Sequence, residues 1–407
     1  MRPRYFLFLL LVAAVPVTAR AQTNELLMTG LDNRGDNISI FAYRNGTYQP
    51  VWSANAGSGA FMPGGRLGDL NNDGVSDVAL TRRVTITSRK QTTFVTYLDV
   101  YQAHGSYATG EQTWDRVVST LVTSSGTAFV GAVGDFDGDT FNEVLISKPN
   151  PYGYEVWGGA TANSSTLKKE TALATTGSTV WISSAAGDLN NNGRPELLVH
   201  TPNDSTISVF EYRPDTGYAR IAAVPWIGPI DDGDVGDVNG DGQLELVFCG
   251  GFRKSVVMEW SQSAGYHIAY ESDDAGRVVQ SCSVGDLDDD GIANFFDAVG
   301  EGYRVFRGGY GGYQQTASGG DQASGITPLG STYVGDSDND GSGEFIHAVS
   351  ISVTTGRGKT RTTQTQFHYL LRECDGTGGF TLTHNWTTIP ANSGGPTFII
   401  GDLDPYR

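Results

Sequence analysis

A short acidic phrase recurs six times along the chain and limits what the chain can fold into. Its clearest copy is Gly236-Asp237-Val238-Asn239-Gly240-Asp241-Gly242-Gln243-Leu244-Glu245, which runs into the apolar Leu246-Val247-Phe248. Oxygen-bearing side chains occupy positions 1, 3, 5 and 9 of the phrase, and glycine occupies position 6. Ca²⁺ takes six to eight oxygen ligands at about 2.3–2.6 Å, and a tight glycine turn lets alternate side chains converge on one ion. The phrase therefore predicts calcium-binding loops.

The copies are spaced at nearly regular intervals. Their first residues stand at positions 69, 135, 188, 237, 286 and 336, so the intervals are 66, 53, 49, 49 and 50 residues. Turn-rich, β-rich repeats of about 40–50 residues are typical of propellers and other closed arrays. A general prior of about 150 residues per domain would suggest two or three domains. The repeat period instead favours one repetitive domain.

Short β-type runs fill the spaces between the acidic phrases. They are rich in β-branched and aromatic residues and include residues 38–43, 94–101, 206–212 and 255–260, whereas few segments show a helical apolar period. Each unit offers one strand before the phrase, one after it, and a following pair joined by a Gly/Asn/Asp turn. Four such strands make one propeller blade.

The two ends of the repeat region complement each other. Residues 398–404 repeat the first half of the phrase, and residues 24–28 repeat the second half. Pairing between the last inner strand and the first strand of the chain would leave no free sheet edge. We therefore predict an all-β fold, a seven-bladed β-propeller of four-stranded blades closed by its N- and C-terminal strands, as a single domain over residues 22–407.

The first 21 residues form a separate segment. Arg2 and Arg4 precede an apolar run over residues 5–15, and Ala19-Arg20-Ala21 resembles a signal-peptidase site. The run is too short to span a membrane, and no later stretch approaches the eighteen or so apolar residues that a span needs. We expect a signal peptide over residues 1–21, cleaved before Gln22, and a mature chain without a membrane span that is secreted, or periplasmic if the host is bacterial.

The charge balance restricts the partners. The chain has 27 basic and 45 acidic side chains; without Arg2, Arg4 and Arg20 the basic count falls to 24 and the net charge to −21. Nucleic acid is excluded as a partner because its phosphates need a basic face, and divalent ions would offset the charge of the loops.

The three cysteines are too few for a disulfide framework; they allow one pair in an oxidising compartment, and the sequence does not choose it among Cys249, Cys282 and Cys374.

The acidic phrases, each followed by an apolar strand, resemble the FG-GAP/VCBS repeats of integrin α-subunit propellers and of secreted seven-bladed lectins of the fungal Psathyrella type. The resemblance covers essentially all of residues 22–407. In that family the phrase links the two innermost strands of a blade and holds calcium through positions 1, 3, 5 and 9 and the carbonyl of position 7. The resemblance thus implies up to six structural Ca²⁺ ions with the following ligands: Asp69, Asn71, Asp73, Val75, Asp77; Asp135, Asp137, Asp139, Phe141, Glu143; Asp188, Asn190, Asn192, Arg194, Glu196; Asp237, Asn239, Asp241, Gln243, Glu245; Asp286, Asp288, Asp290, Ile292, Asn294; and Asp336, Asp338, Asp340, Ser342, Glu344.

The copies differ in their suitability for a metal ion. Asn294 replaces the ninth-position acid in the copy that starts at Asp286, and the copy that starts at Asp188 has neutral asparagines at positions 3 and 5. A truncated seventh copy starts at Asp402 and has Tyr406 at its fifth position. We expect weaker occupancy in these three. An EF-hand is excluded because it needs an acid at position 12 and flanking helices, and position 12 is apolar in the first four copies.

The repeat alone does not select a function, because members of the family include adhesion receptors, sugar-binding lectins and some lyases. The sequence has neither a Gly-x-Ser-x-Gly elbow nor a His-Glu-x-x-His zinc motif, and its six histidines are scattered among the repeats, which favours a binding protein over an enzyme. Crevices between blades lined by aromatic groups suit neutral sugars. The tryptophans late in their units, near the expected outer strands, can equally be packing residues; these are Trp52, Trp114, Trp226 and Trp386.

We therefore expect a secreted, calcium-binding recognition protein, lectin-like and monomeric, whose partner is an extracellular glycan or protein. Two alternatives stay open: a polysaccharide lyase or other glycan-active enzyme, and an integrin-like adhesion module. The tripeptide Arg34-Gly35-Asp36 would suit the adhesion module, although an ordinary hairpin turn also accounts for it.

Overall fold

The computed structural model describes most of the chain after the expected signal peptide. The residues that it describes are 24–31, 37–55, 57, 59–61, 64–88, 91–104, 113–150, 152–159, 167–175, 184–250, 252–300, 302–309, 311–320, 326–356, 361–375, 379–388, 397–401 and 403. The signal peptide, the tripeptide at 34–36 and the aspartates of the truncated seventh copy fall outside these ranges.

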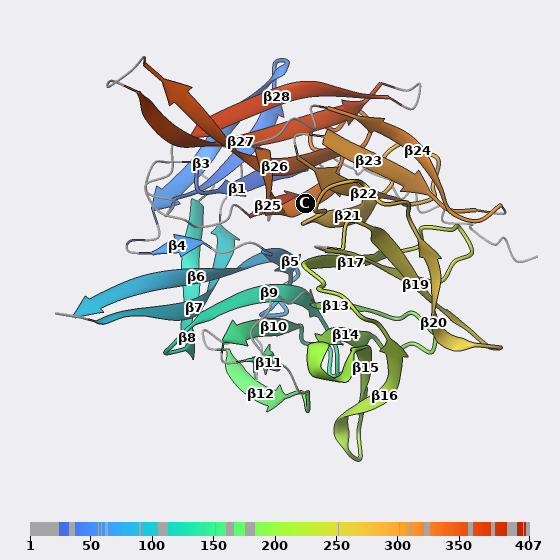
Figure 1. Cartoon of the computed structure of the whole chain (residues 1–407). Helices are drawn as coiled ribbons and strands as arrows, with labels where there is room; N and C mark the ends of the chain where they lie inside the picture. Colours follow the sequence, from blue (N-terminus) through green and yellow to red (C-terminus); the bar gives the residue numbers. More distant parts are fainter. Residues whose placement is uncertain are drawn as a thin grey trace, which may run out of the picture.

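The described structure consists almost wholly of antiparallel β-sheets (Figure 1). The described residues contain no α-helix, and the 3₁₀ turn η1 spans Pro202–Asp204. Sheet A pairs β29 (Phe398–Gly401), β1 (Glu25–Thr29), β2 (Asn37–Arg44) and β3 (Thr47–Asn55). In sheet B, β4 (Ala60–Phe61) and β5 (Arg66–Gly68) both pair with β6 (Asp77–Ser88), which is followed by β7 (Gln91–His104) and β8 (Thr113–Thr123).

The other five sheets each have four strands in simple up-and-down order. Sheet C contains β9 (Thr127–Gly134), β10 (Glu143–Asn150), β11 (Tyr152–Gly158) and β12 (Lys168–Ala172). Sheet D contains β13 (Ser184–Gly187), β14 (Glu196–Thr201), β15 (Thr206–Arg213) and β16 (Gly217–Pro225). Sheet E contains β17 (Asp232–Gly236), β18 (Glu245–Cys249), β19 (Ser255–Ser261) and β20 (Gly265–Glu271). Sheet F contains β21 (Cys282–Gly285), β22 (Asn294–Val299), β23 (Gly302–Arg307) and β24 (Gln314–Gly319). Sheet G contains β25 (Ile326–Gly335), β26 (Glu344–Thr355), β27 (Thr362–Cys374) and β28 (Phe380–Thr388).

The innermost strands of the sheets contact one another in a cycle. β5 contacts β9, and the contacts continue through β13, β17, β21, β25 and β29 back to β5. Figure 1 shows the sheets arranged around a common centre near these strands. The prediction of an all-β chain built from four-stranded antiparallel units is confirmed.

The glycine that precedes five of the six acidic phrases is required by packing against the neighbouring sheet. A Cβ atom at Gly236 would lie 2.4 Å from a methyl of Val284 in the next sheet, and one at Gly335 would lie 2.7 Å from a methyl of Ile400. Real Cβ atoms do not approach this closely, so only glycine lets the inner strands of adjacent sheets come together.

The two ends of the chain share sheet A, as the sequence predicts. β1 pairs with β29 in antiparallel register, with Leu26 opposite Ile400 and Met28 opposite Phe398. The two terminal segments thus form neighbouring strands of one sheet.

The core is divided into clusters that lie between neighbouring sheets. Leu27, Val78 and Ile399 belong to the cluster between sheets A and B, whereas Leu26 belongs to the cluster between sheets G and A. The described residues form seven such clusters, one for each pair of neighbouring sheets. Successive residues of an inner strand face opposite neighbours, which explains why the strands after the acidic phrases are continuous apolar runs.

The four tryptophans late in their units take part in this packing. Trp52, Trp114 and Trp386 lie on the outermost strands β3, β8 and β28, and Trp226 follows β16. Trp114 is buried, and the other three pack against the clusters between sheets. The packing interpretation of these tryptophans is therefore confirmed.

All three cysteines are buried and unbridged. Cys249 on β18 and Cys282 on β21 belong to the same buried cluster between sheets E and F, and the Cys282 thiol donates to the carbonyl of Val247 on β18 at 4.0 Å. Cys374 lies at the end of β27 in sheet G. The structure thus distinguishes a pair that the sequence left open.

Within the described part of the chain, no helix has the length and apolar character needed to cross a membrane.

Candidate metal centres

Each acidic phrase links the innermost strand of one sheet to the strand that follows it in the chain, for example β5 to β6 and β17 to β18. We name the loops after their sheets: loop B (69–77), loop C (135–143), loop D (188–196), loop E (237–245), loop F (286–294) and loop G (336–344). In every loop the residue at position 9 is the first residue of the second strand. The sheet therefore fixes position 9, and the turn must bring positions 1, 3 and 5 toward it.

The aspartate at position 1 holds the turn together. In loop B, Oδ1 of Asp69 accepts the N–H of Asp73 at 3.0 Å and Oδ2 accepts the N–H of Gly74 at 2.8 Å. The aspartates that open loops D, E, F and G accept the N–H groups of positions 5 and 6 in the same way. Position 6 has a positive φ, for example 84° at Gly74, which glycine adopts without strain. Loop C is the exception, because Thr140 takes this conformation with φ of 78°.

Position 5 orders the second half of each loop. Oδ1 of Asp241 accepts the N–H of Gln243 at 2.8 Å, and Oδ1 of Asp340 accepts the N–H of Ser342 at 2.8 Å. The same bond to position 7 recurs in the other four loops. One oxygen of the position 5 side chain is thus engaged in holding the loop.

Position 9 is buried in every loop and is at most 2 % exposed. Its side chain accepts the N–H of position 2, for instance Phe136 to Glu143 at 2.7 Å and Val238 to Glu245 at 2.9 Å. In loop F the amide oxygen of Asn294 takes this place and accepts the N–H of Leu287 at 2.9 Å. The bond recurs in the remaining loops.

Two of these buried acids keep an oxygen without a partner. Among the described residues, Oδ1 of Asp77 and Oε1 of Glu344 are buried and accept no hydrogen bond. Leaving a buried carboxylate oxygen without a hydrogen-bond donor is costly. A cation beside it would remove this cost.

The buried acids also show the electrostatic cost of the loops. Burial raises the pKa of Glu143, Glu245 and Glu344 to about 8. Neighbouring carboxylates raise the pKa further, whereas a hydrogen bond from the loop backbone lowers it. Burial likewise raises the pKa of Asp77 and Glu196 to about 7. A divalent cation among these groups would compensate both the lost hydration and the mutual repulsion.

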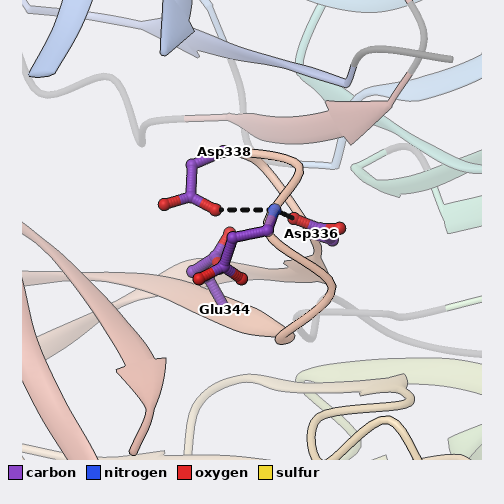
Figure 2. A group of neighbouring side chains, drawn as sticks. Asp336, Asp338 and Glu344 are labelled. Atoms are coloured by element: carbon purple, nitrogen blue, oxygen red, sulfur yellow. Dashed lines mark hydrogen bonds between the residues drawn. The ribbon is translucent and has the colours of Figure 1, made fainter. Parts of the chain in front are cut away.

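Loop G brings together the largest group of carboxylates in the described residues. Ligand atoms of Asp336, Asp338, Asp340 and Glu344 all lie within 4.8 Å of one another. Figure 2 shows Asp336, Asp338 and Glu344 gathered at this loop. The three carboxylates of Asp135, Asp137 and Glu143 in loop C, and those of Asp286, Asp288 and Asp290 in loop F, meet the same limit.

At position 3, loops B, D and E have asparagine, whereas loops C and G have aspartate. Asn239 donates to Oε1 of Glu245 at 3.1 Å, and its own oxygen accepts the N–H of Asp241 at 2.8 Å. In loop D, Oδ1 of Asn190 is buried without a partner among the described residues. These loops therefore bring oxygen atoms together with fewer negative charges.

The sequence interpretation missed one set of residues that touch the loops. They lie on the outer strands: Gln102 on β7, Glu170 on β12, Glu211 on β15, Glu259 on β19, Arg307 on β23 and Glu373 on β27. Gln102 donates to Asp73, and Asn192 donates to Glu211 at 2.7 Å. Most of them lie on the third strand of their sheet opposite position 9, a relationship that only the strand register reveals.

Comparison with known proteins identifies the repeat over part of the chain. Residues 188–248, which span loops D and E and the strands between them, match an FG-GAP-like repeat. No curated protein matches the sequence. A crystal structure described as that of a functionally unknown protein from Desulfotomaculum acetoxidans DSM 771 is similar in fold, with a TM-score of 0.51 and 12 % identity over 93 % of this chain and 99 % of that chain. The chain thus contains an FG-GAP-like repeat within a repetitive all-β fold.

Proposed function

We propose that the chain is a seven-bladed β-propeller that binds Ca²⁺ in its acidic loops and serves as an extracellular recognition protein for carbohydrate. The cyclic contacts of the inner strands and the core clusters between sheets support the propeller architecture. Each sheet would then be one blade, with sheet A closing the cycle from both ends of the chain.

The observation that carries the calcium proposal is the buried, unpartnered oxygen of Asp77 and of Glu344. In loop G, the ion would be held by Asp336, Asp338, Asp340 and Glu344, with the carbonyl of Ser342 as the backbone ligand. Bound Ca²⁺ would supply positive charge and would accept oxygen ligands from the loop, and it has no redox chemistry. The surrounding residues fit a hard cation because every side-chain donor is an oxygen atom.

The recognition proposal has support in the surface of sheet B. Phe94 on β7 is 41 % exposed and is the sole aromatic side chain among the large hydrophobic residues that the structure describes as exposed. The β6–β7 register places Thr85 opposite Phe94, and Thr87 opposite Thr92. The Arg83 guanidinium lies over the Phe94 ring, 4.8 Å from its centroid. An aromatic ring, a guanidinium and several hydroxyl groups in one place suit a neutral sugar, which stacks its apolar face and hydrogen-bonds through its hydroxyls.

The experiment is a glycan-array screen of residues 22–407, run in calcium and in EDTA with circular dichroism to verify folding. Calcium-dependent binding to a defined sugar is the expected result. Phe94→Ala should abolish that binding. Leu121→Ala should preserve it, because Leu121 is also an exposed apolar residue of sheet B but lies on β8. Absence of glycan binding by the folded, calcium-loaded protein would overturn the carbohydrate proposal.

A further inference from the structure

The six loops differ in the residue that faces position 9 from the neighbouring strand. In sheet D, Glu211 on β15 pairs with Glu196, and in sheet G, Glu373 on β27 pairs with Glu344. Directly opposed residues of an antiparallel pair project from the same face, about 4.5–5.5 Å apart between Cβ atoms. In these two sheets the facing position therefore adds a negative charge beside the loop.

The facing position carries an acid in several sheets. Oε2 of Glu211 accepts a hydrogen bond from Asn192 at 2.7 Å, and Oε1 of Glu259 accepts one from Asn239 at 3.5 Å. Burial raises the pKa of Glu373, and the carboxylates of loop G, Asp338 first, raise it further. These acids make the loops of sheets D, E and G more negative than the loop residues alone.

Sheet C supplies the acid from a different strand. The register places Gly158 on β11 opposite Glu143, because Val144 pairs with Trp157 one residue further along. A Cβ atom at Gly158 would lie 1.9 Å from Oε1 of Glu170 and 3.3 Å from Cγ of Glu143. The Glu170 carboxylate, which comes from β12, therefore fills the space that a side chain at Gly158 would take.

Sheet F carries the opposite charge. Phe295 pairs with Phe306, so Asn294 and Arg307 are the next residues on the two strands. Nη2 of Arg307 forms an ion pair with Oδ2 of Asp290, and Nη1 lies 3.7 Å from Oδ2 of Asp288. The guanidinium thus contacts positions 3 and 5, two of the positions that a metal ion would need.

The charge at loop F differs accordingly from that at loop G. At its ligand positions loop G has four carboxylates and faces a fifth, whereas loop F has three carboxylates and the neutral Asn294 at these positions and faces a guanidinium. The three aspartates of loop F are as close together as the acids of loop C. Proximity of acids therefore does not separate the two kinds of loop; the sign of the facing charge does.

We propose that Arg307 takes the place of the metal ion in loop F, which does not bind Ca²⁺, whereas the loops faced by an acid do. This rests on the calcium loops proposed above. A second cation beside the guanidinium would be repelled and would have to displace it from Asp288 and Asp290. The four loops faced by an acid (C, D, E and G) and loop B, which is faced by the neutral Gln102, then remain for calcium, and sheet F keeps its shape without it.

The test counts bound Ca²⁺ by native mass spectrometry of residues 22–407 after equilibration with calcium. Asp290→Asn and Asp340→Asn change the same position in loops F and G. We expect Asp290→Asn to leave the number of bound ions unchanged and Asp340→Asn to lower it by one. An equal loss in both variants would overturn the role of Arg307 while leaving calcium binding intact.

A gain of one ion provides the converse test. Arg307→Glu combined with Asn294→Glu gives the ligand positions and the facing position of loop F the charges that loop G has there, and we expect one more bound Ca²⁺ than in the wild type. Arg220→Gln is the matched control, because Arg220 pairs with the surface residue Asp204 at 3.4 Å and the count should not change. Wild-type protein that binds no Ca²⁺ at all would overturn the calcium loops themselves, and the two failures are thus distinguishable.

Discussion

The carboxylate of Glu25 accepts the backbone N–H of Leu403 at 3.0 Å, although 378 residues separate them. The bond reproduces the one between positions 9 and 2 of the acidic loops, such as that between Glu143 and Phe136. Glu25 is 2 % exposed and begins β1, as the residues at position 9 begin their strands. The first and last segments of the chain thus rebuild across sheet A what other sheets build from one continuous segment.

Replacing Glu25 by alanine should weaken this terminal connection. The change leaves the buried N–H of Leu403 without its acceptor, so we expect the free energy of unfolding to fall by about 1–3 kcal/mol. Urea denaturation followed by tryptophan fluorescence measures the difference. Gln314→Ala, an exposed change on β24, is the control, and equal stability of the two variants would contradict the expectation.

Removal of calcium should lower the melting temperature of the whole chain. A ligand that binds only the folded state adds about 2.7 kcal/mol per site at a free concentration 100-fold above its Kd. Differential scanning calorimetry in calcium and in EDTA tests this, with magnesium as the control for a nonspecific effect of ionic strength. Identical melting curves in calcium and EDTA would refute calcium binding by the loops.

The contribution of His200 to the stability of the folded chain should be lost in mild acid. This residue on β14 is 3 % exposed, its Nδ1 has no hydrogen-bond partner among the described residues, and burial lowers its pKa to about 4. Since the unfolded pKa is about 6.5, the unfolded chain takes up a proton first, and stability present above pH 6.5 is lost as the pH falls toward 4.

The loss attributable to His200 is about 3 kcal/mol over that interval. Urea titrations of the wild type and of His200→Gln at several pH values isolate it, because other titrating groups contribute equally to both proteins. The variant should show a flatter dependence on pH between 6.5 and 4. The half-buried His267 on β20 offers the control variant His267→Gln, and parallel curves for wild type and His200→Gln would contradict the prediction.

Oxidative refolding should link Cys249 with Cys282. Both residues lie in the buried cluster between sheets E and F, so glutathione disulfide can be reduced to two glutathione molecules while the two thiols lose their protons and form the S–S bond. Peptide mapping without reductant identifies the product. Cys374→Ser should retain the link and Cys249→Ser should abolish it, whereas a bridge that includes Cys374 would be the contrary result.

Much of the inner part of the fold was predictable because it follows from one continuous phrase. The glycine, the acids at fixed positions and the apolar run encode a strand, a tight turn and a second strand within about fifteen residues, and Gly236 through Phe248 contain all of them. The pairing of the terminal strands was predictable for the same reason, since each end carries one half of the phrase.

The residues that face position 9 could not be predicted, because their distance along the sequence depends on the length of the hairpin between the second and third strands. Glu211 follows Glu196 after a short hairpin, whereas Glu373 follows Glu344 after the long β26–β27 hairpin. Glu170 reaches its loop from the fourth strand, through the space left by Gly158. Only the register of the strands brings such residues to a common place.

The pairing of β1 with β29 also places a demand on synthesis. β1 leaves the ribosome early, and its partner follows only when residues 398–401 have been translated. Until then one edge of an apolar strand stays unpaired, and such an edge readily pairs with another chain. The cell must therefore shield this nascent segment through nearly the whole of translation, and a product that terminates before β29 leaves that edge permanently open to aggregation.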